Sequence, residues 1–356
     1  MGKPSWRLFK ALSLEIEESL MSVEYTPRNM SVLENITSVI ADSDLDGLMA
    51  AAILKAAKPE LTVEFSHAAL IRSGLIDEKI SKQTALCDLP FHPKCGLYLD
   101  HHMTNRPSPE EEKQFVLQGG ICHWRDTPSA ARAAYDLMKE EVDLDHLVEI
   151  MPIVDALDSG GISLERFLED GEIIRLSRSL SLREPEHLNT VLEQFASGEK
   201  LEQILASHSD RLNQLSKSRK QESDIVSKNI EIIDSLAICR MQNSEIRTNG
   251  YLVTALAGDE AIACCVIHGW LDGSIDTPNR PALSASFYSN SFRKEPNDFD
   301  LSKLATLLDI TGGGHANACG CRIQPINSEG DLEDRPITSE DIERNISLWL
   351  KLWAQR

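Results

Sequence analysis

Through residues 37–160 the chain alternates short apolar runs with segments of helical pattern. Short, continuous apolar runs are typical of strands that are buried on both faces, and we expect such strands at 38–41, 61–65, 84–86 and 96–99. Helices are predicted between them, at 47–57 and at 128–139, where Thr127 is the expected cap and Pro128 takes the first helical position. Strands that alternate with helices indicate a parallel sheet with covered faces, so the predicted fold class is α/β.

The middle of the chain has a different pattern. Residues 163–233 are rich in Leu, Glu, Ser and Lys without strand alternation, and 201–232, which lacks Gly and Pro, is predicted as one long helix. Strand-like runs return at 236–241, 251–257, 261–268 and 282–288, followed by helices at 301–308 and from about Thr338 onward. Together with the length of 356 residues, this predicts an N-terminal parallel-sheet domain at 1–200, a smaller C-terminal α/β domain at 234–356, and a helical linker at about 163–233.

Acidic side chains and histidines come directly after the predicted strands. They are Asp42, Asp44 and Asp46 after the first strand, Asp88 after the third, Asp100, His101 and His102 after the fourth, and Asp155 and Asp158 after a later apolar run. Each group taken alone is also compatible with a solvated polar turn. In a parallel sheet, however, the carboxyl ends of the strands meet at one edge, so these groups are expected to converge.

Converging carboxylates repel one another strongly unless cations lie between them. Because most of the candidate ligands are oxygen atoms, the expected cofactors are two divalent ions, manganese or magnesium. Two such ions can stabilise both the attacking and the leaving oxygen in a phosphoryl displacement. The pattern therefore predicts a two-metal phosphoesterase.

A second chemical feature lies near the C-terminus, where Gly312-Gly313-Gly314 precedes His315. Successive glycines let backbone amides approach an anion closely, and His315 can donate to a phosphate oxygen. Taken alone, the same residues are more typical of a tight turn between a helix and a strand. Arg322 is a further candidate for contact with a phosphate or terminal base, whereas three other arginines are interpreted as surface residues: Arg72, Arg106 and Arg132.

In their order and spacing these motifs resemble those of the DHH phosphoesterase family, over about residues 35–325. The matching residues are Asp42-x-Asp44-x-Asp46-Gly47, Asp88, Asp100-His101-His102 and Asp155, and then the glycine-rich signature of the family's C-terminal DHH-associated domain from Thr311 to Gly320. Many members have histidine where this chain has Asp42, and RecJ-type exonucleases have aspartate. The resemblance implies a helical connection between the two domains and an active site between them.

The resemblance also implies a role for each matching residue. Asp42 and Asp44 belong to the first metal, Asp46 to the second, and Asp88 bridges the two ions. His101 and Asp155 complete the second metal site, with Asp158 as the alternative to Asp155. His102 is expected to face the scissile phosphate and Asp100 to support a histidine, whereas the substrate-binding residues are Gly312, Gly313, Gly314, His315 and Arg322.

Composition narrows the substrate and the cellular setting. The net charge is −20, and no basic stripe is present to follow a long duplex nucleic acid. No apolar stretch reaches the roughly 18 residues of a membrane span, and residues 1–22 are interpreted as an amphipathic helix rather than a signal peptide. The eight cysteines are interpreted as buried free thiols. We therefore expect a cytoplasmic protein without a membrane partner.

The function predicted from the sequence is hydrolysis of short nucleotide substrates: oligoribonucleotides, linear or cyclic dinucleotides, or 3′-phosphoadenosine 5′-phosphate. One alternative is a RecJ-like single-strand exonuclease, which Asp42 favours but which needs a cationic channel. Others are an exopolyphosphatase, which needs more converging Lys and Arg, and a non-catalytic nucleotide sensor, which would have lost metal ligands. A homodimer is compatible with the sequence, which does not decide the oligomeric state.

Overall fold

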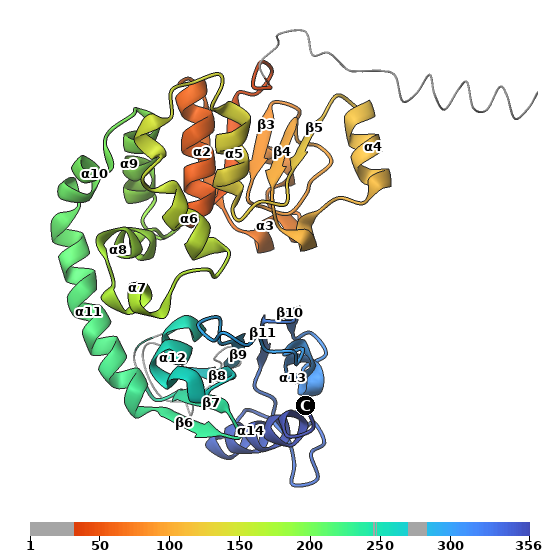
Figure 1. Ribbon diagram of the computed structural model, residues 1–356. Helices are drawn as coiled ribbons and strands as arrows, with labels where there is room; N and C mark the ends of the chain where they lie inside the picture. The colour runs from red at the N-terminus through yellow and green to blue at the C-terminus, as the bar shows by residue number, and fades with distance from the viewer. Residues whose placement is uncertain (1–31, 245, 247, 270–282) are drawn as a thin grey trace, which may run out of the picture.

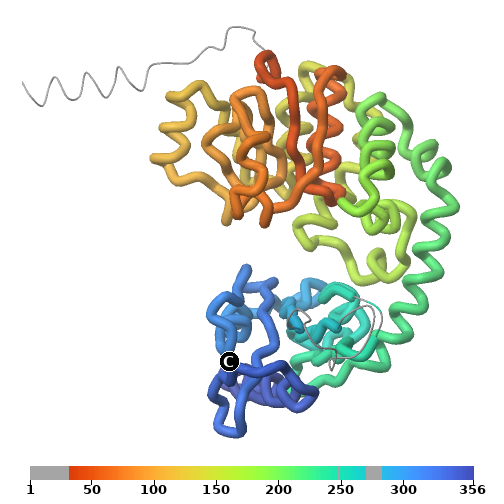
Figure 2. The backbone as a smooth tube through the Cα atoms, turned by 180° about the vertical axis from the view of Figure 1, so that it is seen from behind, coloured from red at the N-terminus to blue at the C-terminus, as the bar shows by residue number. Residues whose placement is uncertain are grey.

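The computed structural model describes residues 32–356 apart from 245, 247 and 270–282, so the helix expected at 1–22 lies outside the described residues. Two sheet-containing units face each other and are joined along one side by helices (Figure 1). The long helix α11 (Ser209–Lys228) runs from one unit toward the other, which the view from behind also shows (Figure 2). Among the described helices, none has both the length and the apolar character that crossing a membrane requires.

The N-terminal unit contains a five-stranded sheet whose neighbouring strands are all parallel, in the order β2-β1-β3-β4-β5. The strands are β1 (Ser38–Asp42), β2 (Thr62–Ser66), β3 (Thr84–Cys87), β4 (Leu97–Asp100) and β5 (Ile121–Trp124). The first four agree with the predicted strands to within one or two residues. The sequence analysis missed β5 because this edge strand is partly exposed and carries no continuous apolar run.

Alternate residues of the central strands enter two separate cores, which explains why the strands are apolar throughout. Val39, Ala85 and Leu97 pack with α2 (Leu45–Ala57) and α5 (Ala130–Met138) on one face. On the other face Ile40 and Tyr98 pack under α3 (Ala68–Arg72) and α4 (Pro109–Leu117). Coverage of both faces is typical of parallel sheets and confirms the predicted α/β fold class.

Helix α5 begins two residues later than predicted. Its cap is Ser129, which accepts a hydrogen bond from the backbone N–H of Arg132, and not Thr127. Pro128 consequently precedes the helix and does not occupy its first turn. This small shift affects the site, because the first backbone N–H groups of α5 point at a buried carboxylate.

A series of helices connects the two sheets. They are α6 (Met151–Asp158), α7 (Leu164–Glu169), α8 (Glu172–Ser179), α9 (Pro185–Ala196), α10 (Leu201–Ser207) and α11. The single helix predicted at 201–232 is wrong: the chain bends at His208 between α10 and α11, and 230–233 forms a strand. Helix α9 packs in the N-terminal core, whereas Phe167 of α7 packs against the C-terminal unit. The domain boundaries at 200 and 234 therefore stay a prediction.

The C-terminal unit is built on a mixed sheet of order β10-β11-β9-β8-β7-β6. Its strands are β6 (Ile230–Ile233), β7 (Leu236–Met241), β8 (Ala263–His268), β9 (Ser284–Ser289), β10 (Gly313–His315) and β11 (Ala318–Arg322). Strands β7 and β8 are parallel neighbours, and a crossover helix joins them. That helix is α12 (Gly250–Ala257), so the strand predicted at 251–257 is wrong. A short apolar run has no period that separates a buried strand from a buried helix, and here Asn249 caps a helix by accepting from Leu252 N–H.

The unit is completed by α13 (Ser302–Leu308) and α14 (Ser339–Trp353), which agree with the two last predicted helices. Thr338 and Asp341 form a capping box at the start of α14, and Trp349 and Trp353 are fully buried. All eight cysteines are free, and only Cys122 among them is not fully buried, which confirms the interpretation as buried thiols. Four short 3-10 turns lie at Asp77–Lys79, Met103–Asn105, Asp145–Leu147 and Gly258–Glu260.

Candidate metal centre

The first acidic motif occupies the sharp turn between β1 and α2. Asp44 is the cap of α2 and accepts a hydrogen bond from Gly47 N–H at 2.9 Å. A side chain at Gly47 would place its Cβ 2.5 Å from the Asp42 carbonyl oxygen, so only glycine permits this turn. Partial burial and the neighbouring charge of Asp44 raise the pKa of Asp42 to about 6. The local structure therefore crowds carboxylates at the carboxyl end of β1.

Asp46 lies in the first turn of α2 and is buried. Its two oxygens accept hydrogen bonds from the first backbone N–H groups of α5, those of Ala130 and Ala131, both at 2.7 Å. The positive end of α5 thus holds the carboxylate in place. Burial nevertheless raises the pKa of Asp46 well above its ordinary value, and the charges of Asp158 and Asp44 add to this effect.

Asp88 follows β3 and has a left-handed backbone, with φ of 58°. Its N–H donates to the carbonyl of Leu99 on the adjacent strand β4, which holds the turn in place. Burial, with the charges of Asp46 and Asp44, raises the pKa of Asp88 well above its ordinary value. Its Oδ1 atom is buried and has no hydrogen-bond partner in the described part of the chain. An aspartate held this way is available to a cation.

Asp100 ends β4, is fully buried and organises the two histidines that follow it. It accepts hydrogen bonds from the Tyr98 hydroxyl at 2.7 Å and from His101 N–H at 2.7 Å, and its Oδ1 lies 3.0 Å from His102 Nδ1. Burial raises the pKa of Asp100, but the hydrogen bond and charge of His102, together with hydrogen bonds from Tyr98 and Asn105, outweigh burial and lower it. Asp100 therefore stays ionised and fixes the His102 ring, whose outer edge is exposed.

His101 has the geometry of a metal-binding imidazole. Its Nδ1 lies 3.0 Å from the carbonyl oxygen of Thr127, an arrangement that keeps a proton on Nδ1 and leaves Nε2 as the nitrogen that could bind a metal ion once it loses its own proton. Nε2 is 2.9 Å from Asp158 Oδ2 and 3.7 Å from Asp46 Oδ2. Burial lowers the pKa of His101, but the carboxylates of Asp158 and Asp46 outweigh burial and raise it to about 9.

The two acids of α6 have different surroundings. Asp155 accepts a hydrogen bond from Ser129 Oγ at 2.7 Å and pairs with Arg132 through Nε at 3.0 Å and Nη2 at 2.5 Å. Its charge is thus already balanced. Asp158, three residues later, faces His101 and contributes its charge to the group around Asp46. The structure accordingly brings Asp158, rather than Asp155, into contact with the other candidate ligands.

Two overlapping groups of side chains could hold metal ions. One consists of Asp88, Asp100, His101 and His102, and the other of Asp46, His101 and Asp158. Within the described ranges, no Lys or Arg forms an ion pair with Asp42, Asp44, Asp46, Asp88 or Asp100. Hard oxygen donors with the imidazoles of His101 and His102, and a buried Asp88 Oδ1 whose contact is His102 Nδ1 at 3.3 Å, fit divalent ions of the manganese or magnesium class.

The glycine loop belongs to the other unit. Gly313 and Gly314 have φ of 154° and 139°, and a Cβ on Gly314 would lie 2.7 Å from the Ala318 carbonyl oxygen, so the short strand β10 requires glycine there. His315 ends β10 and is exposed. Figure 1 shows β10 at the edge of the C-terminal unit that faces the N-terminal unit. The loop is therefore on the side from which it can approach a phosphate held by the other unit.

The arginines have structural partners. Arg322 is held by the buried carboxylate of Asp309, through Nε at 3.0 Å and Nη2 at 2.8 Å, and it also donates to the Thr311 hydroxyl. Its predicted contact with substrate stays a prediction, because the same contacts also let it act as a brace for the glycine loop. Arg72 donates to Asn105, and Arg106 stacks on the Trp124 ring.

Sequence reasoning missed several groups that position the site. Tyr98 and the Thr127 carbonyl orient Asp100 and His101, and the indole N–H of Trp124 donates to the His102 carbonyl at 3.0 Å. These contacts join residues up to 26 positions apart and leave no local pattern. Only Thr127 carried a signal, since it is the cap predicted for the helix at 128–139.

Comparison with models of known protein families and with curated proteins gives no match. Solved structures do match. A pGpG-specific phosphodiesterase, PggH from Vibrio cholerae, is 18% identical with a TM-score of 0.66, over 89% of this chain and 99% of that one. The exonuclease RecJ bound to manganese is 11% identical with a TM-score of 0.52, over 93% and 96%. RecJ from Thermus thermophilus in complex with Mn²⁺ is 11% identical with a TM-score of 0.50, over 90% and 54%.

These likenesses extend through both units of the chain. They confirm that the protein has the fold of DHH phosphoesterases, as its ordered motifs predicted. At these identities they show the fold alone. What the site does has to be inferred from its own residues.

Proposed function

We propose that the protein is a phosphodiesterase that uses two divalent metal ions, with manganese as the preferred ion, to hydrolyse short nucleotide substrates. The observation that carries this proposal is the group of acids at the sheet edge. Asp46 and Asp88 are buried, have raised pKa values, and have no Lys or Arg partner among the described residues. Such an arrangement is costly without cations, and it becomes favourable when divalent ions neutralise the carboxylates.

The proposed ligands are Asp42, Asp44, Asp46, Asp88, His101 and Asp158. Asp88 is assigned as the ligand that both ions would share, because it belongs to the first group of side chains while the charges of Asp46 and Asp44 also act on it. Asp158 replaces Asp155 in this assignment because Asp155 is neutralised by Arg132. When bound, the ions supply Lewis acidity for the phosphoryl oxygens and lower the pKa of water.

The remaining residues of the site act on the substrate directly. Asp100 accepts the Nδ1 proton of His102 and so presents the opposite edge of the ring to the substrate. From there His102 can donate a hydrogen bond to an oxygen of the scissile phosphate. The exposed His315 and the amides of the glycine loop are assigned to a phosphate oxygen from the other side.

Short substrates are favoured for two reasons. The net charge of −20 opposes binding of a long polyanion, although screening beyond about 8 Å limits this effect at physiological salt. One of the similar structures, PggH, is a pGpG-specific phosphodiesterase, and pGpG is a dinucleotide. The RecJ structures make a single-strand exonuclease the competing activity.

The test is a product assay on the purified full chain with Mn²⁺. The substrates are a 5′-phosphorylated dinucleotide, RNA and DNA of five and twenty nucleotides, and inorganic polyphosphate, and the control is the same reaction with excess chelator. We expect turnover per end to be highest on the dinucleotide and to fall as the strand lengthens. Equal or rising rates on the twenty-nucleotide strands would support the exonuclease instead, and absence of metal-dependent hydrolysis on every substrate would reject the proposed function.

A further inference from the structure

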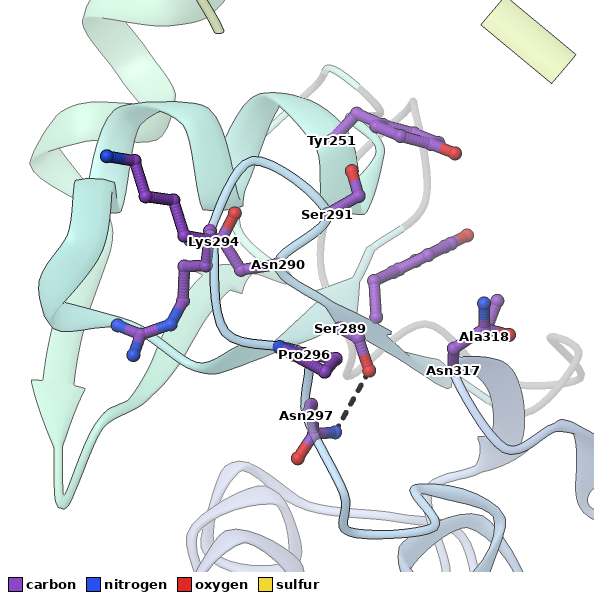
Figure 3. A pocket seen from close by; sticks show the side chains of 11 residues that line it. Tyr251, Ser289, Asn290, Ser291, Lys294, Pro296, Asn297, Asn317 and Ala318 are labelled. Atoms are coloured by element: carbon purple, nitrogen blue, oxygen red, sulfur yellow. Dashed lines mark hydrogen bonds between the residues drawn. The ribbon is translucent and has the colours of Figure 1, made fainter. Parts of the chain in front are cut away.

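A pocket of about 460 Å³ lies in the C-terminal unit, beside the glycine loop but outside the residues assigned to phosphate. This size is within the range of pockets that bind small organic ligands, roughly 300–1,000 Å³. Its walls include Tyr251, Tyr288, Asn297 and Asn317. Figure 3 shows the pocket from close by, with Tyr251 at one end and Asn317 and Ala318 at another.

The pocket adjoins both halves of the proposed active site. Asn317 lies in the turn between β10 and β11, two residues after His315. Tyr251, on the opposite wall, approaches the N-terminal unit: a Cβ on Gly160 would lie 3.4 Å from the Tyr251 hydroxyl oxygen. Gly160 is two residues beyond Asp158, a proposed metal ligand. Burial raises the pKa of Tyr251, and the charge of Asp158 contributes to this shift, in agreement with their proximity.

The polar groups that line the pocket are mainly neutral. Asn297 donates to the Ser289 hydroxyl at 2.9 Å, so these two side chains satisfy each other. The Tyr251 hydroxyl, the Asn317 amide and the Ser291 hydroxyl, in contrast, have no side-chain hydrogen bond in the described part of the molecule. Three neutral donors and acceptors are thus available on a wall that also carries aromatic rings.

The aromatic rings are held firmly. A Cβ on Gly250 would lie 2.0 Å from Tyr288 Cδ2, so the missing side chain of Gly250 makes room for the Tyr288 ring. Tyr251 packs on Phe167 and Phe292, with ring centroids 6.2 Å apart in both cases. Rigid aromatic surfaces of this kind are the usual stacking platforms for bases.

The cations of the pocket are poorly placed for a phosphate. Arg293 is engaged by the Asp259 carbonyl. Lys294 directs its amine away from Tyr251 and Asn317 (Figure 3). A phosphate in the pocket would therefore meet neutral groups, whereas a flat neutral heterocycle would find rings to stack on and amides to bond with.

We propose that this pocket binds the base of one nucleotide of the substrate while the adjoining phosphate lies between the glycine loop and the metal centre. This inference rests on the proposed function and deepens it. It assigns Tyr251, Tyr288 and Asn317 to base recognition. A polyphosphate chain has no base to place here, so the pocket favours a nucleotide substrate over polyphosphate.

The test uses three substrates with Mn²⁺: a 5′-phosphorylated guanylyl dinucleotide and two analogues, each of which lacks one base. In the wild type we expect kcat/KM to fall about tenfold or more when one particular base is missing. Tyr251→Ala and Asn317→Ala should lower kcat/KM on the complete dinucleotide by a similar factor. On the analogue that lacks the base bound in the pocket, the same variants should have little further effect. Tyr251→Phe keeps the packing of the ring and should show a smaller part of the same loss, which separates recognition from misfolding.

The outcomes distinguish the two proposals. If the wild type hydrolyses none of the three substrates, the proposed function fails. If the wild type hydrolyses all three substrates equally, the proposal of a base pocket is rejected. The same holds if the variants lose kcat/KM by the same factor on every substrate. In both cases the proposed phosphodiesterase function is unaffected. Lys294→Ala is the matched control and should keep the discrimination between substrates; a large loss on all three would instead assign the pocket to a phosphate.

Discussion

Both units bury aspartates, but the surroundings of Asp46 and Asp88 in the N-terminal unit differ from those of Asp309 and Asp341 in the C-terminal unit. Asp309 and Asp341 of the C-terminal unit are neutralised from within, by Arg322 and by Arg335. The hydrogen bonds from Arg322 lower the pKa of Asp309, and at Asp341 the bonds from Arg335 outweigh burial and lower its pKa as well. Asp46 and Asp88 of the N-terminal unit have raised pKa values and no such partner among the described residues.

The difference separates acids that stabilise the fold from acids that are held for a ligand. A buried carboxylate is tolerated when charged hydrogen bonds replace the lost water, as at Asp341. Among the described residues, the basic side chains that form ion pairs with Asp46 and Asp88 are His101 and His102, and each already faces more than one carboxylate. The N-terminal unit therefore carries excess negative charge that divalent ions would balance, whereas the C-terminal pairs need no ion.

The largest effect is expected from Asp88→Asn. Asparagine tolerates the left-handed backbone at this position and keeps the size of the side chain, but it cannot act as a bridging carboxylate. We expect turnover with Mn²⁺ to fall by at least about 1,000-fold, since loss of the bridge removes the transition-state stabilisation by both ions. In the metal-free protein the same variant should raise Tm, because it removes one of several mutually repelling charges.

Asp341→Asn is the matched comparison and should act in the opposite direction. It leaves Arg335 without its buried partner and should lower Tm whether or not metal is present. Thermal unfolding with chelator and with Mn²⁺ distinguishes the two variants. A metal-free Asp88→Asn protein less stable than the wild type would contradict the view that these carboxylates repel one another.

A smaller effect separates the two acids of α6. If Asp158 is the metal ligand, Asp158→Asn should weaken Mn²⁺ binding by about 10- to 100-fold. Asp155→Asn should leave Mn²⁺ affinity within a few-fold of the wild type and instead destabilise the packing of α6 on α5, where Arg132 loses its partner. Mn²⁺ titration of both variants measures this, and the reverse ranking would restore Asp155 as the ligand.

The choice between Asp155 and Asp158 illustrates where sequence reasoning ends. The apolar runs predicted β1, β3 and β4 correctly, because strands buried on both faces leave a continuous hydrophobic signal. Acids at the ends of those strands indicated where a metal centre would form. Asp155 and Asp158, however, lie on the same helical run, and only the rotation of α6 against α5 gives one of them to Arg132 and the other to His101.

Contacts between distant segments escaped prediction for the same reason. No ion-pair partner for Arg322 is evident in the sequence, because its partner Asp309 lies thirteen residues earlier, before the hairpin of β10 and β11. The apolar residues at 251–257 show no period that separates a strand from a helix, so the strand prediction there is wrong. The helix is needed because β7 and β8 are parallel and require a crossover, and this pairing is not visible in the local sequence. Contacts between distant segments thus determine which side chains pair and whether some apolar runs form strands or helices. The local sequence pattern shows only which residue types are present at each position.

The smallest expected effect is a pH dependence that inverts with metal. In the metal-free protein the pKa of Asp42 is about 6, and those of Asp46 and Asp88 are also raised, whereas the unfolded carboxyl has its ordinary value of 3.8. Between pH 6 and pH 4 these carboxyls bind more protons in the folded state than in the unfolded state, so their contribution to stability should rise as the pH falls through this window. His123, His187 and His208 act in the opposite direction, because burial lowers their pKa values and they bind fewer protons in the folded state. Asp309 and Asp341 have lowered pKa values, so their contribution is complete above 3.8 and is lost only as the pH falls below it. A comparison of variants isolates the acids at the sheet edge. With chelator, the change in Tm from pH 7.5 to pH 5 should be more favourable by a few degrees in the wild type than in Asp88→Asn, and saturating Mn²⁺ should reverse that order, because metal binding requires ionised carboxylates and neutral His101. The Asp341→Asn variant should respond to pH as the wild type does over this window. Equal changes in the wild type and in Asp88→Asn with chelator would show that the acids at the sheet edge are already neutralised by groups of the protein itself.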